Sequence, residues 1–360
     1  MLIFSALMIS NPLVINCLLG ILLSLLVAAF SNCRERAFRW VSLLLCSTMV
    51  ILRSFMDINS LPDLPEYEQG FIALRSISWG KVPNEWIGVK IDEVGFRFFL
   101  KIVGLFSDNF HVFLFVMGIV WMALYYKTIK RYSPYVVVSL LLVLVGSFNQ
   151  SLFVIRQHLA MAICFYSYKY IISKDIKSYL ITILLAFLMH QTALVFLPLY
   201  FVYHIKNRRT LLLTIFIGAL LMYLSFSYLL NQIGGNMLTG YSSYLESDEG
   251  TNAMGFLIML SMLLCYCLFL RRNAFNEGIN KLLLISLLFG TTLCFVGIGF
   301  NPTGRLAMYY SSTAFLAIPI IMQHISSRLI RYSFLSVVYT LFFSLSFWGS
   351  NSTIISNYSF

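Results

Sequence analysis

The sequence predicts an all-α, polytopic integral membrane protein with about 10–12 transmembrane helices, including one broken or re-entrant hairpin, and with external loops. Two observations predict this fold class. Of the 360 residues, 59% are hydrophobic and only 11% are charged, and the mean hydropathy of +0.84 is far above that of a soluble domain. In addition, apolar runs of ~20 residues, the length an α-helix needs to cross a bilayer, recur from one end of the chain to the other.

The apolar runs and their polar flanks place the expected helices. These lie at residues 5–30, 38–55, 109–126, 134–148, 150–172, 209–229, 254–270, 279–298, 305–323 and 331–349. The stretch 178–205 is too long for one span and is interrupted at His190 and again at Pro198. Basic residues flank both of its ends, and by the positive-inside rule both ends are cytoplasmic. We therefore expect two short arms, 178–190 and 191–205, that meet at an external turn.

A single helical membrane domain is expected over residues 1–360, with two longer external segments. The segment 56–108 is rich in acidic and aromatic residues, and 94–106 has the pattern of an amphipathic helix. The segment 230–252 is a second external loop, with a glycine pair and an acidic run. The first thirty residues are apolar, but they lack the basic N-terminal region and the cleavage site of a signal peptide. We therefore expect them to form a first transmembrane span that is not removed.

Charge and cysteine usage exclude several classes of protein. The net charge of +11 comes from short basic clusters between apolar runs and not from one extended face, which argues for membrane topology and against nucleic acid binding. The seven cysteines lie in apolar runs or in a basic loop without zinc-like spacing. We expect no structural disulfide, no metal ion and no cofactor.

Ionisable groups within membrane spans usually face a cavity or a partner and mark a pathway or a site. Arg53, Arg156 and Arg305 all lie near the external ends of expected helices, and His190 lies at the same depth. Because arginine gives bidentate, permanently charged hydrogen bonds, these side chains suit the pyrophosphate of a lipid-linked substrate. The alternative is that each arginine reaches the headgroups or pairs with a loop acid, as Arg53 would with Asp57 one turn away.

Proton transfer has its own candidates. A histidine can accept a proton near neutral pH, so His190 is either a general base or a core residue that bridges helices. His158 lies roughly 200° around the helix from Arg156, which favours a structural role. Asp63 and Glu93 are external carboxylates that could bind sugar hydroxyls or activate one, although most loop acids are only solvated. Tyr67 follows Asp63 at a spacing that would put both on one helical face.

Five short motifs occur in an order that resembles EpsG-like proteins, which are similar to Wzy O-antigen and capsular polysaccharide polymerases. The motifs, spread over roughly residues 50–310, are Asp63-x3-Tyr67-x3-Phe71, Glu93-x-Gly95-Phe96, Arg156-Gln157-x-Leu159-Ala160, His190-x2-Ala193 followed by Pro198, and Gly304-Arg305-Leu306-x2-Tyr309. Each motif is degenerate, and their order and topological placement are the specific part of the resemblance.

The resemblance implies a glycosyltransferase of the bacterial inner membrane that works at the periplasmic face in lipopolysaccharide or other polysaccharide biosynthesis. Its partners would be undecaprenyl-pyrophosphate-linked oligosaccharides, the lipid bilayer and a separate chain-length regulator.

Carried over to this sequence, the resemblance also assigns roles to residues. Arg156 and Arg305, with Arg53, would bind the pyrophosphate that leaves. His190, Asp63 or Glu93 would accept the proton of the attacking hydroxyl. The glycan would be contacted by Tyr67, Gln157 and Tyr309.

Two other classes of function stay open from sequence. A lipid-linked oligosaccharide flippase or another transporter would also use basic cavity residues and a broken helix. Against it, the ionisable residues lie near one face and no repeat is visible. A membrane O-acyltransferase would need a histidine that faces a tunnel from the cytoplasm, whereas His190 maps to the external side.

Overall fold

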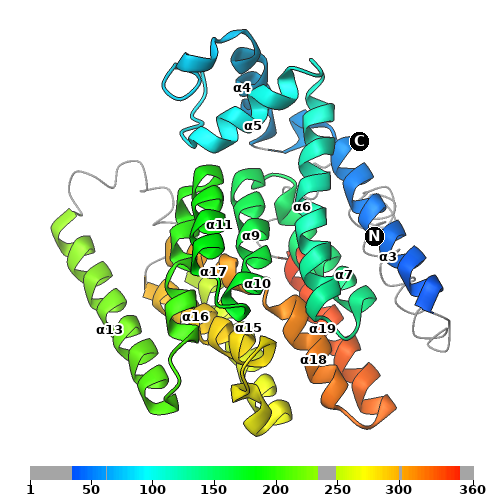
Figure 1. Ribbon diagram of the computed structural model, residues 1–360, viewed down its shortest axis with the longest axis vertical. Helices are drawn as coiled ribbons and strands as arrows, with labels where there is room; N and C mark the ends of the chain where they lie inside the picture. The colour runs from blue at the N-terminus through cyan, green and yellow to red at the C-terminus, as the bar shows by residue number, and fades with distance from the viewer. Residues whose placement is uncertain (1–34, 62, 234–248, 300–301, 349–360) are drawn as a thin grey trace. The chain divides into compact units, whose positions relative to one another are not determined.

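The computed structural model describes residues 35–61, 63–233, 249–299 and 302–348, and within these ranges every regular element is helical (Figure 1). The span expected at 5–30 and most of the segment 230–252 lie outside the described residues. The longer helices are α3 (Glu35–Ser54), α4 (Leu64–Ser76), α5 (Val94–Gly104), α6 (Phe110–Tyr132), α7 (Val136–Val143), α9 (Ile155–Tyr166), α11 (Ile176–Met189), α13 (Arg208–Ile233), α15 (Glu249–Leu270), α16 (Ile279–Gly299), α17 (Pro302–Ser311), α18 (Ala314–His324) and α19 (Arg328–Trp348).

The helices confirm the predicted all-α membrane fold. Three of them are long and apolar enough to cross a bilayer, at Phe110–Tyr132, Ala253–Phe275 and Ile279–Ile298. A fourth span results if α17 and α18, which meet at a 47° bend, are counted as one broken helix. Several other expected spans are interrupted helices. The run 134–148, for example, divides into α7 and a π-helix, and 150–172 divides into α9 and the short α10 (Tyr168–Ile172).

The chain divides into two compact units. The first comprises Met1–Tyr166, Leu184–Gln191 and Ser326–Phe360, and the second comprises Ser167–Ile183 and Thr192–Ile325. In the first unit, α3 packs along α6 and α6 packs along α9, while α4 and α5 pack against each other (Figure 1). We call residues 63–106, which contain α4 and α5, the cap. The segment 56–108 was expected to hold only the helix of α5, and α4 is an addition to that expectation.

Local sequence fixes both ends of α6. The Asn109 side chain accepts a hydrogen bond from the backbone N–H of His111 at 2.9 Å, which caps the first turn. Lys130 and Arg131 lie in the last turn, where cations are favourable. The His111 ring Nδ1 lies 2.7 Å from the carbonyl oxygen of Ser54, the last residue of α3. This contact holds the end of α3 beside the start of α6.

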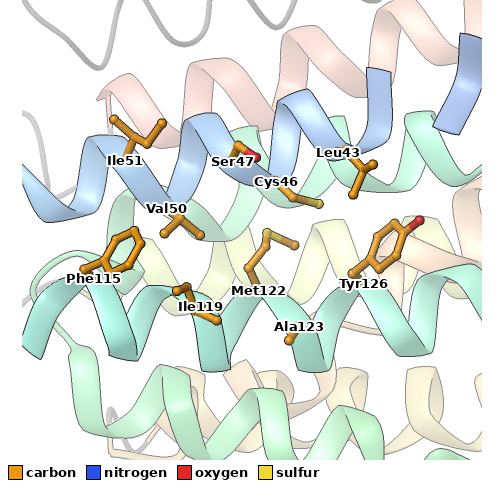
Figure 2. Close-up of a pocket in the computed structure, with 10 residues that line it drawn as sticks. All are labelled: Leu43, Cys46, Ser47, Val50, Ile51, Phe115, Ile119, Met122, Ala123 and Tyr126. Carbon is orange, nitrogen blue, oxygen red and sulfur yellow. The ribbon is translucent and has the colours of Figure 1, made fainter. Parts of the chain in front are cut away.

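A groove of about 430 Å³ runs between α3 and α6, and Figure 2 shows the side chains that line it. Its lining is apolar apart from a few groups such as Ser47 and the Tyr126 hydroxyl, and it includes Val50, Ile119 and Met122. None of the described residues that line the groove is charged. It therefore suits hydrocarbon and lacks the groups that acid–base chemistry needs.

The helix that precedes α9 is interrupted in an unusual way. After α7, residues Leu144–Phe148 form a π-helix, followed by the single turn α8 (Asn149–Ser151) and a break before Ile155. π-Helical turns widen the backbone and frequently occur at functional sites. As a result, Arg156 lies in the first turn of α9 and not in the middle of a continuous helix.

In the second unit, α16 is the central helix and contacts α10, α12 (Pro198–Tyr203), α13, α15 and α17. The chain reverses between Tyr179 and Tyr200, whose rings lie 5.1 Å apart, and the Tyr179 hydroxyl donates to the carbonyl of Phe196 at 2.5 Å. A 3₁₀ helix (Gln191–Phe196) precedes Pro198, which begins α12 as prolines often begin helices. The arms expected at 178–190 and 191–205 correspond to α11 and to this 3₁₀ helix with α12.

Candidate functional site

Four polar side chains of the first unit form one hydrogen-bonded cluster, the polar tetrad of Tyr67, Glu93, Arg156 and His190. The carboxylate of Glu93 accepts from Nη1 of Arg156 on one oxygen, and its other oxygen lies 2.7 Å from Nδ1 of His190. The Nε of Arg156 donates to the Tyr67 hydroxyl at 3.1 Å, and its guanidinium lies 5.4 Å from the centre of the Tyr67 ring. Residues from four separate motifs thus meet through Glu93 and Arg156.

Three members of the tetrad lie at or near the end of a helix, and Tyr67 lies within one. Glu93 immediately precedes α5, Arg156 lies in the first turn of α9, and His190 immediately follows α11. Tyr67 lies in the first half of α4 and packs edge-on against Phe96 of α5, with ring centres 5.7 Å apart. The cap therefore contributes Tyr67 and Glu93, and the helices of the bundle contribute the two cationic or basic side chains.

A glycine allows the cap to approach α11 closely. A Cβ atom on Gly95 would lie 2.6 Å from the Cβ of Leu188 and 2.8 Å from its carbonyl oxygen. Those distances are too short for any larger residue, because the backbone of α11 cannot move aside as a flexible side chain could. Gly95 follows Glu93 by two positions and Leu188 precedes His190 by two. The close approach therefore brings Glu93 to His190, which explains physically why glycine occurs in this motif.

Two buried cations of α5 organise the irregular loop that leads to Glu93. Arg97 donates to the backbone carbonyls of Glu85 and Ile91, the latter at 3.5 Å. Lys101 donates to three carbonyls at the end of α4 and just beyond it, those of Leu74 at 2.9 Å, Arg75 at 3.3 Å and Ile77 at 2.5 Å. Since free carbonyls at a helix C-terminus need partners, Lys101 closes α4. The loop is ordered by these bonds although it has little regular structure.

Burial and charge give the members of the tetrad different roles. The Glu93 side chain is only 6% exposed, whereas the Arg156 and His190 side chains are each 23% exposed. Burial raises the pKa of Glu93, but the hydrogen bond with His190 and the charge of Arg156 more than offset it, so the pKa is lowered and the group is a carboxylate. Burial raises the pKa of Tyr67 despite the nearby Arg156, so this hydroxyl stays neutral.

The exposed members keep reactive atoms available. Among the described residues, neither Nη2 of Arg156 nor Nε2 of His190 has a hydrogen-bond partner. With Nδ1 of His190 donating to the Glu93 carboxylate, Nε2 carries the lone pair of the neutral ring. The cluster thus offers a guanidinium donor and a proton acceptor on one partly exposed surface.

The structure places the other candidate residues in different surroundings. Asp63 is exposed at the start of α4, one turn before Tyr67. Gln157 is buried within α9. Arg305 and Tyr309 belong to α17 of the second unit, where Arg305 is exposed and the buried Tyr309 hydroxyl lies 3.0 Å from the Thr192 hydroxyl.

Arg53 is not part of the tetrad. Its side chain is 0% exposed and donates to Sδ of Met117 at 2.9 Å and to the hydroxyl of Ser151. Its guanidinium also lies 5.0 Å from the centre of the Trp121 ring. These contacts tie α3 to α6 and α8. The sequence interpretation had placed Arg53 near the external end of its helix as a candidate for binding pyrophosphate, and here the guanidinium is enclosed by the protein.

His158 is likewise buried, with Nδ1 3.3 Å from the hydroxyl of Ser147 in the π-helix. This environment agrees with the structural role expected for it.

Sequence reasoning did not single out Arg97 and Lys101. The available signal was that they are the only charged residues within α5, four positions apart on an otherwise apolar helix. In an amphipathic helix such a pair is normally taken for the solvent-facing side, whereas here both side chains are buried.

Comparison with known proteins confirms the family that the sequence resembles. The model of the EpsG family matches residues 63–360, a range that contains the whole tetrad as well as Arg305. No curated protein and no solved structure matched the chain. The match extends over most of the sequence and contains residues of both compact units. The chain therefore belongs to the EpsG family, a family of polysaccharide polymerase-type multi-pass membrane proteins.

Proposed function

We propose that this protein joins undecaprenyl-pyrophosphate-linked oligosaccharide repeat units at the periplasmic face of the inner membrane. A growing glycan moves from its lipid carrier onto a fresh lipid-linked repeat, a glycosidic bond forms, and undecaprenyl pyrophosphate is released. The observation that carries the proposal is the placement of the Glu93 carboxylate between Arg156 and His190. Membership of the EpsG family supports a polymerase in preference to another use of such a cluster.

His190 is the general base in this proposal. Its Nε2 takes the proton of the acceptor hydroxyl as the hydroxyl oxygen bonds to the anomeric carbon of the donor. Glu93 is a less suitable base, because its lowered pKa makes it a weak proton acceptor and it is almost fully buried. Glu93 instead acts as a positioning residue that orients the ring through Nδ1 and stabilises the imidazolium that forms.

Arg156 binds the leaving group. As the bond between the anomeric carbon and the pyrophosphate oxygen breaks, the electron pair stays on that oxygen and negative charge grows there. The Nη2 of Arg156 has no protein partner among the described residues and can donate to the pyrophosphate, while Tyr67 and Glu93 hold the rest of the guanidinium. We further propose that the exposed Arg305 contributes a second cation to the same pyrophosphate. Arg53 is buried and is omitted from this role.

The remaining candidates have supporting roles. Asp63 is exposed beside Tyr67 and would accept hydrogen bonds from sugar hydroxyls. Gln157 and Tyr309 are buried, so we assign them to positioning: Gln157 follows Arg156, and Tyr309 bonds to Thr192, two residues after His190. A membrane-bound chain-length regulator would act as a separate partner that sets the number of repeats.

The test is polymerisation by the purified protein in liposomes that contain a lipid-pyrophosphate-linked oligosaccharide. We expect a ladder of glycans and release of one lipid pyrophosphate for each bond formed, both of which are lost in His190→Ala. In cells that lack the protein, single repeats that still reach the surface would support a polymerase. Complete loss of exported repeats together with an inactive purified protein would favour a flippase and overturn the proposal. Transfer of an acyl group in place of a sugar would favour an O-acyltransferase.

A further inference from the structure

Helix α5 of the cap has its charged and apolar faces reversed relative to a helix on the surface of a soluble protein. Its two cations, Arg97 and Lys101, point inward and bond to backbone carbonyls. Its outward side carries the half-buried Phe98 and the exposed Ile102, and the chain continues as Leu105 and Phe106, which are exposed. A helix whose outward side is apolar is stable in that position only when this side is also removed from water.

Apolar side chains on this part of the cap extend the outward side of α5. We call Trp79, Phe98, Ile102, Leu105 and Phe106 the outer face of α5. Trp79 stacks on Phe98 with ring centres 6.2 Å apart, and the Phe106 side chain is 84% exposed. Exposed apolar residues are ordinary when single, but a contiguous aromatic patch marks an interaction surface.

The position of this face in the chain identifies what covers it. Phe106 is followed after three residues by Phe110, where α6 begins, and α6 is one of the helices long and apolar enough to cross a bilayer. The outer face therefore ends where the chain enters the membrane. Tryptophan and other aromatic side chains concentrate at this depth, between headgroups and acyl chains.

From these observations we infer that the outer face of α5 inserts into the outer lipid–water interface and seats the cap on the membrane. Lys101 contributes indirectly. Its side chain is buried, with Nζ bonded to carbonyls at the end of α4 and 5.2 Å from the centre of the Trp79 ring, so its charge is held inside the cap. The cap carries Tyr67 and Glu93, so this seating holds the tetrad at the height of lipid headgroups. The inference concerns membrane contact only, and its failure would leave the proposed reaction untouched.

The test uses the full chain in nanodiscs with a nitroxide spin label on a single cysteine, placed by Ile102→Cys or by Phe106→Cys in a background without the seven native cysteines. Asp92→Cys provides the matched control, since Asp92 is exposed in the same cap but is polar. Collision rates with oxygen, which concentrates in lipid, and with a water-soluble nickel chelate report depth.

We expect the ratio of oxygen to nickel collisions to be several-fold higher at 102 and 106 than at 92. Equal ratios at all three positions would place the face in water and overturn the inference. Exclusion of both reagents at 102 and 106 would mean that a protein covers the face, which would overturn it as well. If the cysteine-free chain does not fold, Phe106→Trp in the native chain should show extra quenching by brominated lipids, and Asp108→Trp should show none.

Discussion

Oε1 of Glu93 lies 2.7 Å from Nδ1 of His190, although 97 positions separate the two residues in the sequence. The contact joins the cap to the end of α11, and the same carboxylate also receives Arg156. Its consequences can be separated by variants that change one partner at a time.

The base and its positioning residue should differ in their effects. We expect His190→Ala to lower kcat by about 10²–10⁴-fold, because the proton acceptor is lost. Glu93→Gln should lower kcat less and shift the pH profile, since the ring remains but loses the charge that orients and stabilises it. Steady-state rates against pH in liposomes measure both effects. Equal losses with an unchanged profile in Glu93→Gln would contradict a positioning role.

The arginine contacts allow a graded series. Arg156→Lys keeps the charge but loses the planar fork that reaches Tyr67, Glu93 and a phosphate together, so we expect a loss of about 10²-fold in kcat/KM. Tyr67→Phe removes one hydrogen bond and should cost at most about 10-fold. Both variants should insert and fold, which size-exclusion profiles in detergent would check. A Tyr67→Phe loss as large as that of Arg156→Lys would show that the tyrosine does more than hold the guanidinium.

Gly95→Ala should loosen the cap. The added Cβ would meet the backbone of Leu188, and overpacking of this kind typically costs about 1–3 kcal/mol. Gly80→Ala is the matched control in the same cap, because nothing lies within 4 Å of a Cβ at that position. Gly95→Ala should lower both the melting temperature and the polymerisation rate, and Gly80→Ala should change neither. A harmless Gly95→Ala would mean that the cap does not dock closely on α11.

Acid should weaken the attachment of the cap. The pKa of Glu93 in the folded protein lies below the ordinary value of 4.5, so its stabilising contribution is complete above that value and is lost as the pH falls through the lower, folded pKa. Between about pH 5 and pH 3, the melting temperature of the wild type should therefore fall more steeply than that of Glu93→Gln. Glu66→Gln, an exposed change in α4, should keep the wild-type slope. If the melting temperatures of the wild type and of Glu93→Gln fell equally steeply with pH, the ionised Glu93 would not stabilise the docked cap.

Arg53→Met and Arg305→Ala should separate structure from function. Arg53 is fully buried against Ser151 and Trp121, so we expect its replacement to change the melting temperature. Arg305 is exposed, and its replacement should leave melting unchanged while raising KM for the lipid-linked donor. Substitutions at buried charges often have the largest effects on stability. An unchanged melting temperature and a raised KM in Arg53→Met would instead indicate that Arg53 binds the pyrophosphate.

The sequence predicted the fold class, and it singled out three residues that the structure brings together, but it did not predict the contacts between them. Hydropathy and basic flanks identified the helices, because a bilayer imposes both the length and the charge pattern. Arg156, His190 and Glu93 were each proposed from chemistry and from resemblance, but their mutual bonds depend on how the cap folds back, which no local pattern records.

The burial of the candidate arginines was harder to predict than which arginines to consider. Arg53 lies near the end of a helix like Arg156, yet the rotation of α3 turns it inward toward Trp121, whereas the break before α9 leaves Arg156 partly exposed. The π-helix at Leu144–Phe148 carries no sequence signal that we used, and a π-helical turn departs from the period of about 3.6 residues on which the sequence interpretation depends. Periodicity arguments assume an uninterrupted helix, so they fail where the helix is interrupted.

The distance along the chain between Glu93 and His190 also sets an order of events during biosynthesis. The cap leaves the ribosome with its carboxylate before either Arg156 or His190 has been translated, so the cap cannot complete its docking at that stage. Only after α9 and α11 have been inserted does Glu93 meet both partners. The polar tetrad is therefore assembled late relative to the cap, and a nascent chain that stalls before α11 is inserted would have a cap without His190.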